Sequence, residues 1–157
     1  MKNLRTALMC LCTVFIGVAA SAQHGDSPVN EPDNNKPKLF SNLPNKIILE
    51  KVVINDVLTK QPGQPADIKF SADNSIRFEG SVASSASKYN NTVNTIVLRS
   101  TNYPGATLSI TRIAKEEGGF SYTGRLISLK NGDLFELKEI DGSLVLLKKN
   151  FYDLINE

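Results

Sequence analysis

The 157-residue chain has no tryptophan, a single histidine and only two cysteines. Both cysteines, Cys10 and Cys12, lie in the first 22 residues, so the chain beyond them has no thiol for a disulfide, a metal site or nucleophilic catalysis. The histidine, His24, lies among prolines and asparagines that offer it no partner ligands. These absences exclude a zinc site built from cysteine and histidine. They also argue strongly against hydrolysis by a Ser-His-Asp or Cys-His arrangement.

Glycine-rich phosphate-binding motifs are missing as well, because neither G-x-x-x-x-G-K nor G-x-G-x-x-G occurs. Carboxylates remain as possible acid-base groups. Four of them lie in or beside expected strands: Glu79, Asp133, Glu136 and Glu139. A catalytic pair needs a defined spacing that a sequence does not show. We therefore expect no catalytic residue, no metal and no cofactor.

The first 22 residues have the three-part layout of a secretory signal peptide. Lys2 and Arg5 precede an apolar run of 14 residues, and small residues end the segment at Ala22. The run is shorter than the roughly 20 residues of a membrane-spanning helix, so a membrane anchor is the lesser alternative. Cys10 and Cys12 lie in the middle of the run instead of at its end, which makes a lipoprotein the minor interpretation. We expect cleavage after Ala22 and a secreted or periplasmic protein.

The net charge of the chain changes when the signal peptide is removed. The full sequence has 18 basic and 16 acidic residues, and the signal peptide contains two of the basic ones. The remaining chain carries 16 of each sign. A neutral domain has no general electrostatic attraction to nucleic acid or to an anionic membrane. We expect neither partner, and no stable membrane insertion after cleavage.

The chain beyond the signal peptide divides into a leader and one domain. Residues 23–38 are rich in proline and asparagine and bury too little apolar surface to offset their ordering entropy, so we expect a flexible leader. Residues 39–157 suit a single domain. Within it, residues 47–58 fit both a helix and a strand. We favour an extended segment at Lys46–Leu49 followed by one short helix, roughly Glu50–Lys60.

The rest of the domain alternates apolar and polar residues with period two, which is typical of strands with one buried face. Strands are expected at residues 67–70, 76–82, 94–101 and 106–114. The side chains expected to face inward include Ile68, Phe70, Phe78, Ile96, Leu98, Leu108 and Ile110.

Residues 120–149 predict a three-stranded meander, because Asn131-Gly132 and Asp141-Gly142 are the dipeptides preferred in two-residue type I′ turns. That geometry would align Leu126, Leu137 and Leu146 in one inward row. The opposite face would carry Ile127, Glu136 and Leu147, with Arg125 beside Lys138. The predicted fold class is mainly β: a single antiparallel, barrel-like meander of about six to seven strands with one short N-terminal helix. A β-sandwich is the alternative.

Candidate ligand-binding residues come from the loops and from the arginines. Residues 84–92 form a long polar stretch between two strands, and residues 102–105 form a turn. Tyrosine rings and forked arginine donors suit sugars, peptides and carboxylates. The candidates are Tyr89, Asn90, Asn91, Tyr103, Arg99 and Arg112, with Tyr122, Arg77 and Arg125 as further aromatic and cationic groups.

These observations predict a non-enzymatic binding or interaction module that acts outside the cytoplasm. Its ligand would be a carbohydrate, a peptide or a component of the cell envelope. The alternative is an inhibitor or partner protein of a secreted enzyme, which would use a loop or the edge strand expected at residues 67–70. A hydrolase ranks third because the required histidine and cysteine are missing.

Overall fold

The computed structural model describes residues 37–71 and 75–151. The expected signal peptide and nearly all of the expected leader lie outside these residues. Within the described ranges, none of the helical structure is both long and apolar enough to span a bilayer.

Eight strands form one antiparallel sheet, and a single described helix accompanies it. In chain order the elements are β1 (Lys46–Leu49), α2 (Lys51–Leu58), β2 (Pro65–Lys69), β3 (Arg77–Lys88), β4 (Val93–Ser100), β5 (Thr107–Ala114), β6 (Phe120–Ser128), β7 (Asp133–Ile140) and β8 (Ser143–Asn150). The strand order is β1-β8-β7-β6-β5-β4-β3-β2, so β2 to β8 form a continuous meander.

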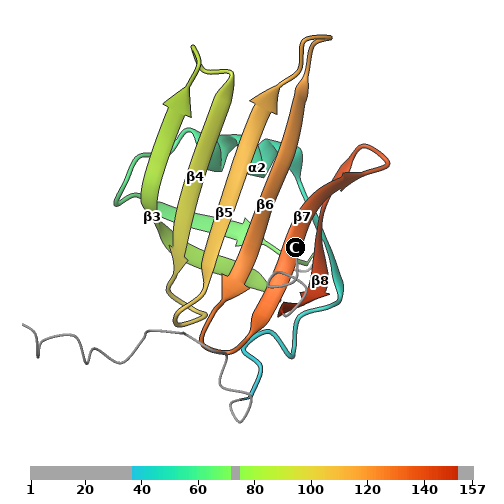
Figure 1. The fold of residues 1–157 in the computed structure, drawn as a ribbon. Coiled ribbons are helices and arrows are strands. Elements are labelled where there is room, and N and C mark those ends of the chain that lie inside the picture. Colours follow the sequence, from blue (N-terminus) through green and yellow to red (C-terminus); the bar gives the residue numbers. More distant parts are fainter. Residues whose placement is uncertain (1–36, 72–74, 152–157) are drawn as a thin grey trace, which may run out of the picture.

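The sheet curls into a half-barrel with α2 on its inner side (Figure 1). The predicted mainly antiparallel, barrel-like fold is confirmed, and the sandwich alternative is wrong because the described strands make one sheet. The sheet has eight strands instead of six or seven. The additional strand is β1, which the sequence predicted only as an extended segment. β2 forms an edge of the sheet, as expected.

Helix α2 closes the inner side of the half-barrel. It packs Ile54, Val57 and Leu58 into the same core as the inward side chains of the sheet. It begins after Glu50, whose backbone is extended, and ends at Thr59, whose hydroxyl donates to the Asp56 carbonyl at 2.7 Å. The two prolines and the glycine of residues 61–65 then prevent any continuation of the helix. The predicted helix is confirmed.

The segment before β1 closes the end of the half-barrel opposite the β3–β4 hairpin. Phe40 is completely buried, and its ring meets Tyr103 and Phe135 edge-on at centroid distances of 5.6 and 5.9 Å. The Leu39 N–H donates to the buried carboxylate of Asp133 at 2.6 Å. Lys148 Nζ donates to the Phe40 carbonyl at 3.1 Å. These contacts fasten residues 39 and 40 to β7 and β8.

The predicted register of the last three strands is half right. Leu137 pairs with Leu146 across the Asp141-Gly142 turn, where both residues have positive φ as a type I′ turn requires. Leu126, however, pairs with Phe135 instead of Leu137.

The predicted register between β6 and β7 is wrong because their connection contains four residues, 129–132, and only Gly132 among them has positive φ. Asn131 is bound instead: its side chain accepts from Ser128 Oγ at 3.0 Å and donates to the Pro37 carbonyl at 3.1 Å. The resulting shift is two residues, which preserves the face of every side chain. Leu126, Leu137 and Leu146 are therefore still buried.

The same shift changes the neighbours on the outer face. Arg125 lies opposite Glu136 and not beside Lys138, which is itself opposite Val145. Lys138 Nζ instead reaches Glu136 on its own strand at 3.0 Å.

The prediction of a nine-residue loop at residues 84–92 is also wrong. Strand β3 continues to Lys88, and its register against β4 shifts between Val82 and Ser84. Residues 84–88, four of which are polar, keep their backbone pairing with β4 even though all five are exposed. The polar composition wrongly predicted a loop here because strand pairing uses backbone groups, and these can pair even where no core covers the side chains. The actual loop is residues 89–92.

An ion pair attaches the start of α2 to β7 and predicts a pH effect. Lys51 Nζ donates to Glu139 Oε1 at 2.6 Å. This hydrogen bond, together with the charges of Lys51 and Lys115, lowers the pKa of Glu139 below its ordinary value of 4.5 against a smaller opposing effect of desolvation. A lowered folded-state pKa stabilises the fold above about 4.5, and this contribution disappears as the pH falls through the folded-state pKa.

We expect a carboxyl NMR titration to place the Glu139 pKa below 4.5 and the Lys51→Met variant to return it toward that value. The Glu139→Gln variant should lose less stability than the unaltered protein on acidification. A Glu139 pKa that Lys51→Met leaves unchanged would contradict this origin of the shift.

Candidate functional site

A row of four side chains marks the point where the inner face of the sheet changes from apolar to polar. Ser87 pairs with Asn94, Asn94 with Arg112, and Arg112 with Tyr122, so the row crosses β3, β4, β5 and β6. We call these four residues the polar rung. The adjacent rung toward the core contains the fully buried Ile96 and Ile110, which fixes the polar rung on the same inner face.

The polar rung lies at the end of the half-barrel formed by the tips of the β3–β4 and β5–β6 hairpins. In Figure 1 these two hairpins extend past α2. The row spans three strand spacings, or roughly 14 Å. Ser87 is exposed, Asn94 and Arg112 are partly buried, and Tyr122 is buried, so the row becomes more enclosed from β3 toward β6.

Helix α2 contributes Asn55 to this row. Its side-chain oxygen accepts from Arg112 Nη1 at 3.1 Å and from Tyr122 Oη at 2.9 Å. The amide therefore links the guanidinium and the phenol to α2. The three groups come from three separate elements, α2, β5 and β6.

Arg112 also contacts an aromatic ring. Its guanidinium carbon lies 4.5 Å from the centroid of Phe120, which is 42% exposed and begins β6. Arginine commonly stacks on aromatic faces in this way. The Nε of Arg112 is buried without a hydrogen-bond partner, and the residue forms no ion pair with any described carboxylate. The cation is positioned but not neutralised.

The loop 89–92 is strained and rigidly held. Tyr89, Asn90 and Asn91 all have positive φ, at 52°, 51° and 66°. Such backbone is unusual for a tyrosine, since non-glycine residues there cost of order 1–3 kcal/mol each. Two members of the polar rung hold the loop: Ser87 Oγ donates to Asn91 Oδ1 at 2.6 Å, and Asn94 Nδ2 donates to the Asn91 carbonyl at 2.8 Å. The loop presents Tyr89 with 77% of its surface exposed.

Replacing Tyr89 with glycine is expected to raise the free energy of unfolding by about 0.5–1 kcal/mol. Removing Cβ relieves roughly 1–2 kcal/mol of left-handed strain, and the greater freedom of unfolded glycine offsets part of it. Urea denaturation measures the change. The matched control is Tyr89→Ala, which removes the ring but keeps Cβ and the strain. Equal stabilities of the two variants would show that the backbone at residue 89 is not strained.

The structure brings together four of the six predicted binding residues. Tyr89, Asn90 and Asn91 form the loop, and Arg112 lies in the polar rung that supports it. Arg99 lies on the outer face of β4, away from this group. Tyr103 lies at the opposite end, where it packs on Phe40, and its burial raises its pKa.

Two residues of this site, Asn55 and Asn94, were missed by the sequence interpretation, and Ser87 was predicted only as part of the polar stretch 84–92. Asn55 is on the helix, and its partners are 57 and 67 positions away in the chain. Ser87 and Asn94 lay in or beside the expected loop and carried no signal of their own. Tyr122 was noted for its ring, and its alternation with Gly124 and Leu126 could have placed it on the inner face.

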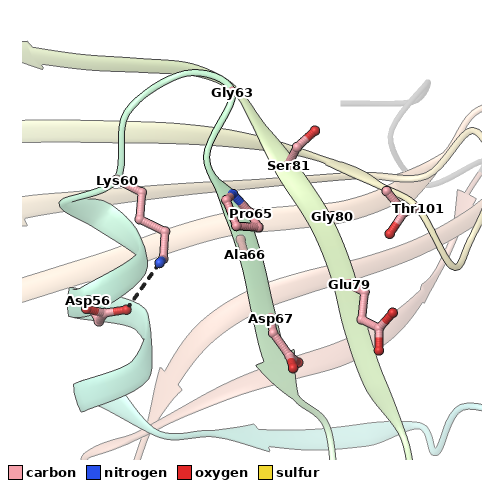
Figure 2. A pocket seen from close by; sticks show the side chains of 10 residues that line it. All are labelled: Asp56, Lys60, Gly63, Pro65, Ala66, Asp67, Glu79, Gly80, Ser81 and Thr101. Carbon is pink, nitrogen blue, oxygen red and sulfur yellow. Dashed lines mark ion pairs between the residues drawn. The ribbon is translucent and has the colours of Figure 1, made fainter.

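A separate groove of about 600 Å³ lies where α2, β2 and β3 meet (Figure 2). Its lining includes Asp56, Lys60, Pro65, Asp67, Glu79 and Ser81. Lys60 and Asp56 pair across one helical turn at 3.7 Å. Asp67 lies directly opposite Glu79 on the neighbouring strand, so two like charges face each other.

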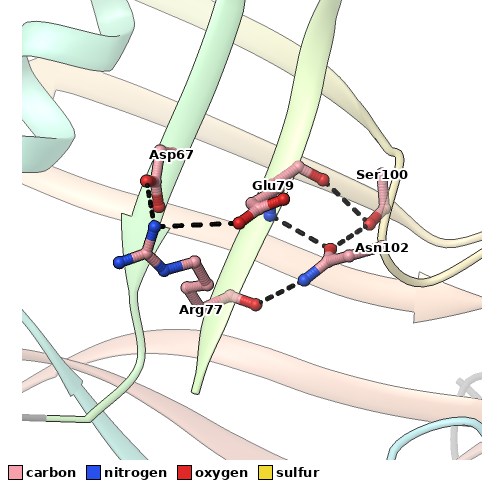
Figure 3. A network of polar contacts seen from close by, with 5 residues as sticks. All are labelled: Asp67, Arg77, Glu79, Ser100 and Asn102. Carbon is pink, nitrogen blue, oxygen red and sulfur yellow. Dashed lines mark hydrogen bonds and ion pairs between the residues drawn. The ribbon is translucent and has the colours of Figure 1, made fainter. Parts of the chain in front are cut away.

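The polar groups beside this groove are occupied with one another (Figure 3). Arg77 Nη1 lies 3.1 Å from Asp67 and 3.7 Å from Glu79, which offsets the repulsion between the carboxylates. Asn102 accepts from the Glu79 N–H at 3.1 Å and donates to the Arg77 carbonyl at 2.8 Å. The network joins β2, β3 and the β4–β5 turn, so its evident role is structural.

The carboxylates considered for acid-base chemistry each have their own partner. Glu79 lies near Arg77, and Glu136 pairs with Lys138. Asp133 accepts from the Leu39 N–H, and Glu139 accepts from Lys51. Among residues 37–71 and 75–151, no cluster of three or more potential metal-ligating His, Cys, Asp or Glu side chains is present. The polar rung and its loop are therefore the best candidate site.

Comparison with known proteins gives no further guide to this site. No family model, curated protein or solved structure matches the chain.

Proposed function

We propose that this chain is a non-enzymatic binding module whose ligand contacts the polar rung and the loop 89–92. One observation carries the proposal: the loop has three consecutive left-handed residues and is fastened to the rung by Ser87 and Asn94. Strain of this kind persists only where the surrounding structure enforces it, and it concentrates at functional sites. A rigid loop beside fixed donors lowers the entropy that binding costs.

The groove beside β2 is the weaker candidate for ligand binding. Its charged groups already pair with one another, so a ligand would have to displace those contacts. Addition of a partner strand to β2 is also disfavoured. Pro65 lacks an N–H and Lys69 is charged, and both features protect edge strands from pairing.

Export belongs to the same proposal. The basic start, the apolar run and the small residues up to Ala22 support a secreted or periplasmic location. N-terminal sequencing of the protein recovered from outside the cytoplasm should begin at Gln23. A retained signal segment would contradict cleavage at this position.

A second candidate is a partner or inhibitor of a secreted enzyme. The protruding Tyr89 on a rigid loop favours it, because an exposed aromatic anchor on a preorganised loop suits a protein pocket. Pull-down from culture fluid would then retain one stoichiometric protein, and Tyr89→Ala would abolish the retention.

The test of the binding module is a ligand panel of neutral oligosaccharides, acidic oligosaccharides and short peptides. Binding is measured by thermal stabilisation and mapped by backbone NMR. We expect the shifts to centre on Asn94, Arg112 and Tyr122. The Asn94→Ala variant should weaken binding, whereas Arg99→Ala on the outer face should not. Shifts that centre on the groove, or no binding by any member, would overturn the proposal.

A further inference from the structure

We propose that the ligand is a saccharide bearing a carboxylate, and that Arg112 binds this carboxylate. The inference rests on the proposed function and names its ligand class. It starts from the charge of the site. Arg112 is a partly buried cation, and no described acidic side chain pairs with it. A partly desolvated charge of this kind is best compensated by an opposite charge.

The contacts of Arg77, an arginine with a structural role, differ from those of Arg112. It lies near two carboxylates, Asp67 and Glu79, on the outer face. Arg112 instead has a neutral amide, Asn55, and an aromatic ring, Phe120. These partners orient the guanidinium without neutralising it. The guanidinium of Arg112 therefore carries a positive charge that no described acidic side chain neutralises.

The unused donors of Arg112 match a carboxylate. Nη1 donates to Asn55, while Nε has no acceptor and Nη2 makes no hydrogen bond to a described residue. Nε and Nη2 form one edge of the planar guanidinium, and two parallel bonds from such an edge to a carboxylate are the strongest arginine contact. Nε is covered in this structure, so a carboxylate reaches this edge only when the guanidinium turns it toward the open end.

The neighbours of Arg112 favour a saccharide over a peptide as the source of the carboxylate. Ser87 and Asn94 stand in line with it across the sheet, and beside their bonds to Asn91 their side-chain oxygens can accept from sugar hydroxyls. The exposed rings of Tyr89 and Phe120 provide apolar faces for a sugar ring. A peptide strand would need unpaired backbone groups at a sheet edge, and β3 to β6 are all interior strands.

The experiment compares uronic-acid oligosaccharides with the same oligosaccharides after methyl esterification, using calorimetric titration of the unaltered protein. Esterification removes the charge and keeps the sugar skeleton. We expect it to weaken binding by roughly 10- to 100-fold, the range for a charge-assisted hydrogen bond. Equal affinity for the acid and the ester would overturn the carboxylate assignment.

Variants locate the contact on Arg112. Arg112→Gln should weaken binding of the acid by about the same factor and change binding of the ester little. Arg112→Lys should bind the acid with an affinity between those of the unaltered protein and Arg112→Gln, because lysine keeps the charge but lacks the forked donors. Arg99→Ala is the control and should bind both as the unaltered protein does. Thermal melting establishes that each variant is folded. The ester comparison tests the proposal even if Arg112→Gln does not fold.

The remaining outcomes separate this inference from the proposed function. If neutral sugars bind as well as acidic ones and Asn94→Ala weakens both, the binding module stands and the carboxylate inference fails. Preference for an acidic peptide over every uronic-acid oligosaccharide would overturn the saccharide assignment. Dimerisation that Arg112→Gln abolishes would assign the surface to a second copy of the chain, which also overturns it. No binding at the polar rung by any probe overturns both proposals.

Discussion

Replacing Phe40 with alanine is expected to lower the free energy of unfolding by about 3–5 kcal/mol. The ring is fully buried and meets Tyr103 and Phe135 in edge-to-face geometry, so truncation removes both apolar burial and two aromatic contacts. The surrounding strands belong to one continuous sheet and have little freedom to collapse into the cavity. Urea denaturation measures the effect as a lower midpoint with an unchanged slope.

Two controls accompany this variant. Phe40→Leu keeps most of the side-chain volume and should cost clearly less than alanine. Leu129→Ala truncates a side chain that is 49% exposed in the nearby β6–β7 loop, and its stability should change by at most about 0.5 kcal/mol. A loss from Phe40→Ala no greater than that from Leu129→Ala would mean that Phe40 does not close the core.

The Tyr103 phenol provides an independent readout of the same cavity. Its burial raises its pKa above 10.0. A raised folded-state pKa favours folding below about 10.0 and loses that contribution as the pH rises through the folded value. The loss of Phe40 admits water, so the phenol pKa should move back toward 10.0 in an absorbance titration.

The Gly124→Ala substitution is expected to destabilise the fold by about 3 kcal/mol, at the upper end of the range for overpacking. Gly124 lies on the inner face of β6 between Ile110 and Leu137. A Cβ added there would collide with the Ser109 carbonyl oxygen and lie 3.2 Å from the Ile110 Cα. These atoms belong to the backbone of the adjacent strand, which does not move aside as a flexible side chain does.

The control is Thr123→Ala, on the exposed outer face of the same strand, which should cost at most about 1 kcal/mol. Comparison of the two melting curves separates steric collision from strand propensity. An alanine at position 124 that leaves stability unchanged would show that β5 and β6 separate easily, and would remove the close approach as a reason for glycine there.

Much of the fold follows from patterns within short stretches of sequence. Period-two alternation predicts the inward side chains of β2 to β5, because a half-buried strand exposes every second residue. The Asp141-Gly142 turn predicts the β7–β8 register because its geometry is local. The Asn131-Gly132 turn misled the register because Asn131 binds Pro37, a residue 94 positions earlier in the chain. Such a contact has no signature in the turn itself.

The candidate site was predictable only in part, for a related reason. The composition of residues 84–92 predicted a recognition loop, and the structure limits the loop to residues 89–92. The polar rung depends on the pairing of four strands and on the Asn55 side chain of α2. Arg112 alternates with Ile110 in β5, so its inward orientation was available from the sequence. Its lack of an acidic partner was not.

The pairing of β1 with β8 has a consequence for the order of folding. Lys46 pairs with Leu147 and Leu49 with Leu144, so the first strand of the sheet finds its neighbour only when the last strand is present. A chain that is still being synthesised from its N-terminus cannot complete this pairing. Contacts so distant in sequence also slow folding. β1 therefore cannot take its place until residues 143–150 are available, so the eight-stranded sheet is completed only after β8 has been synthesised.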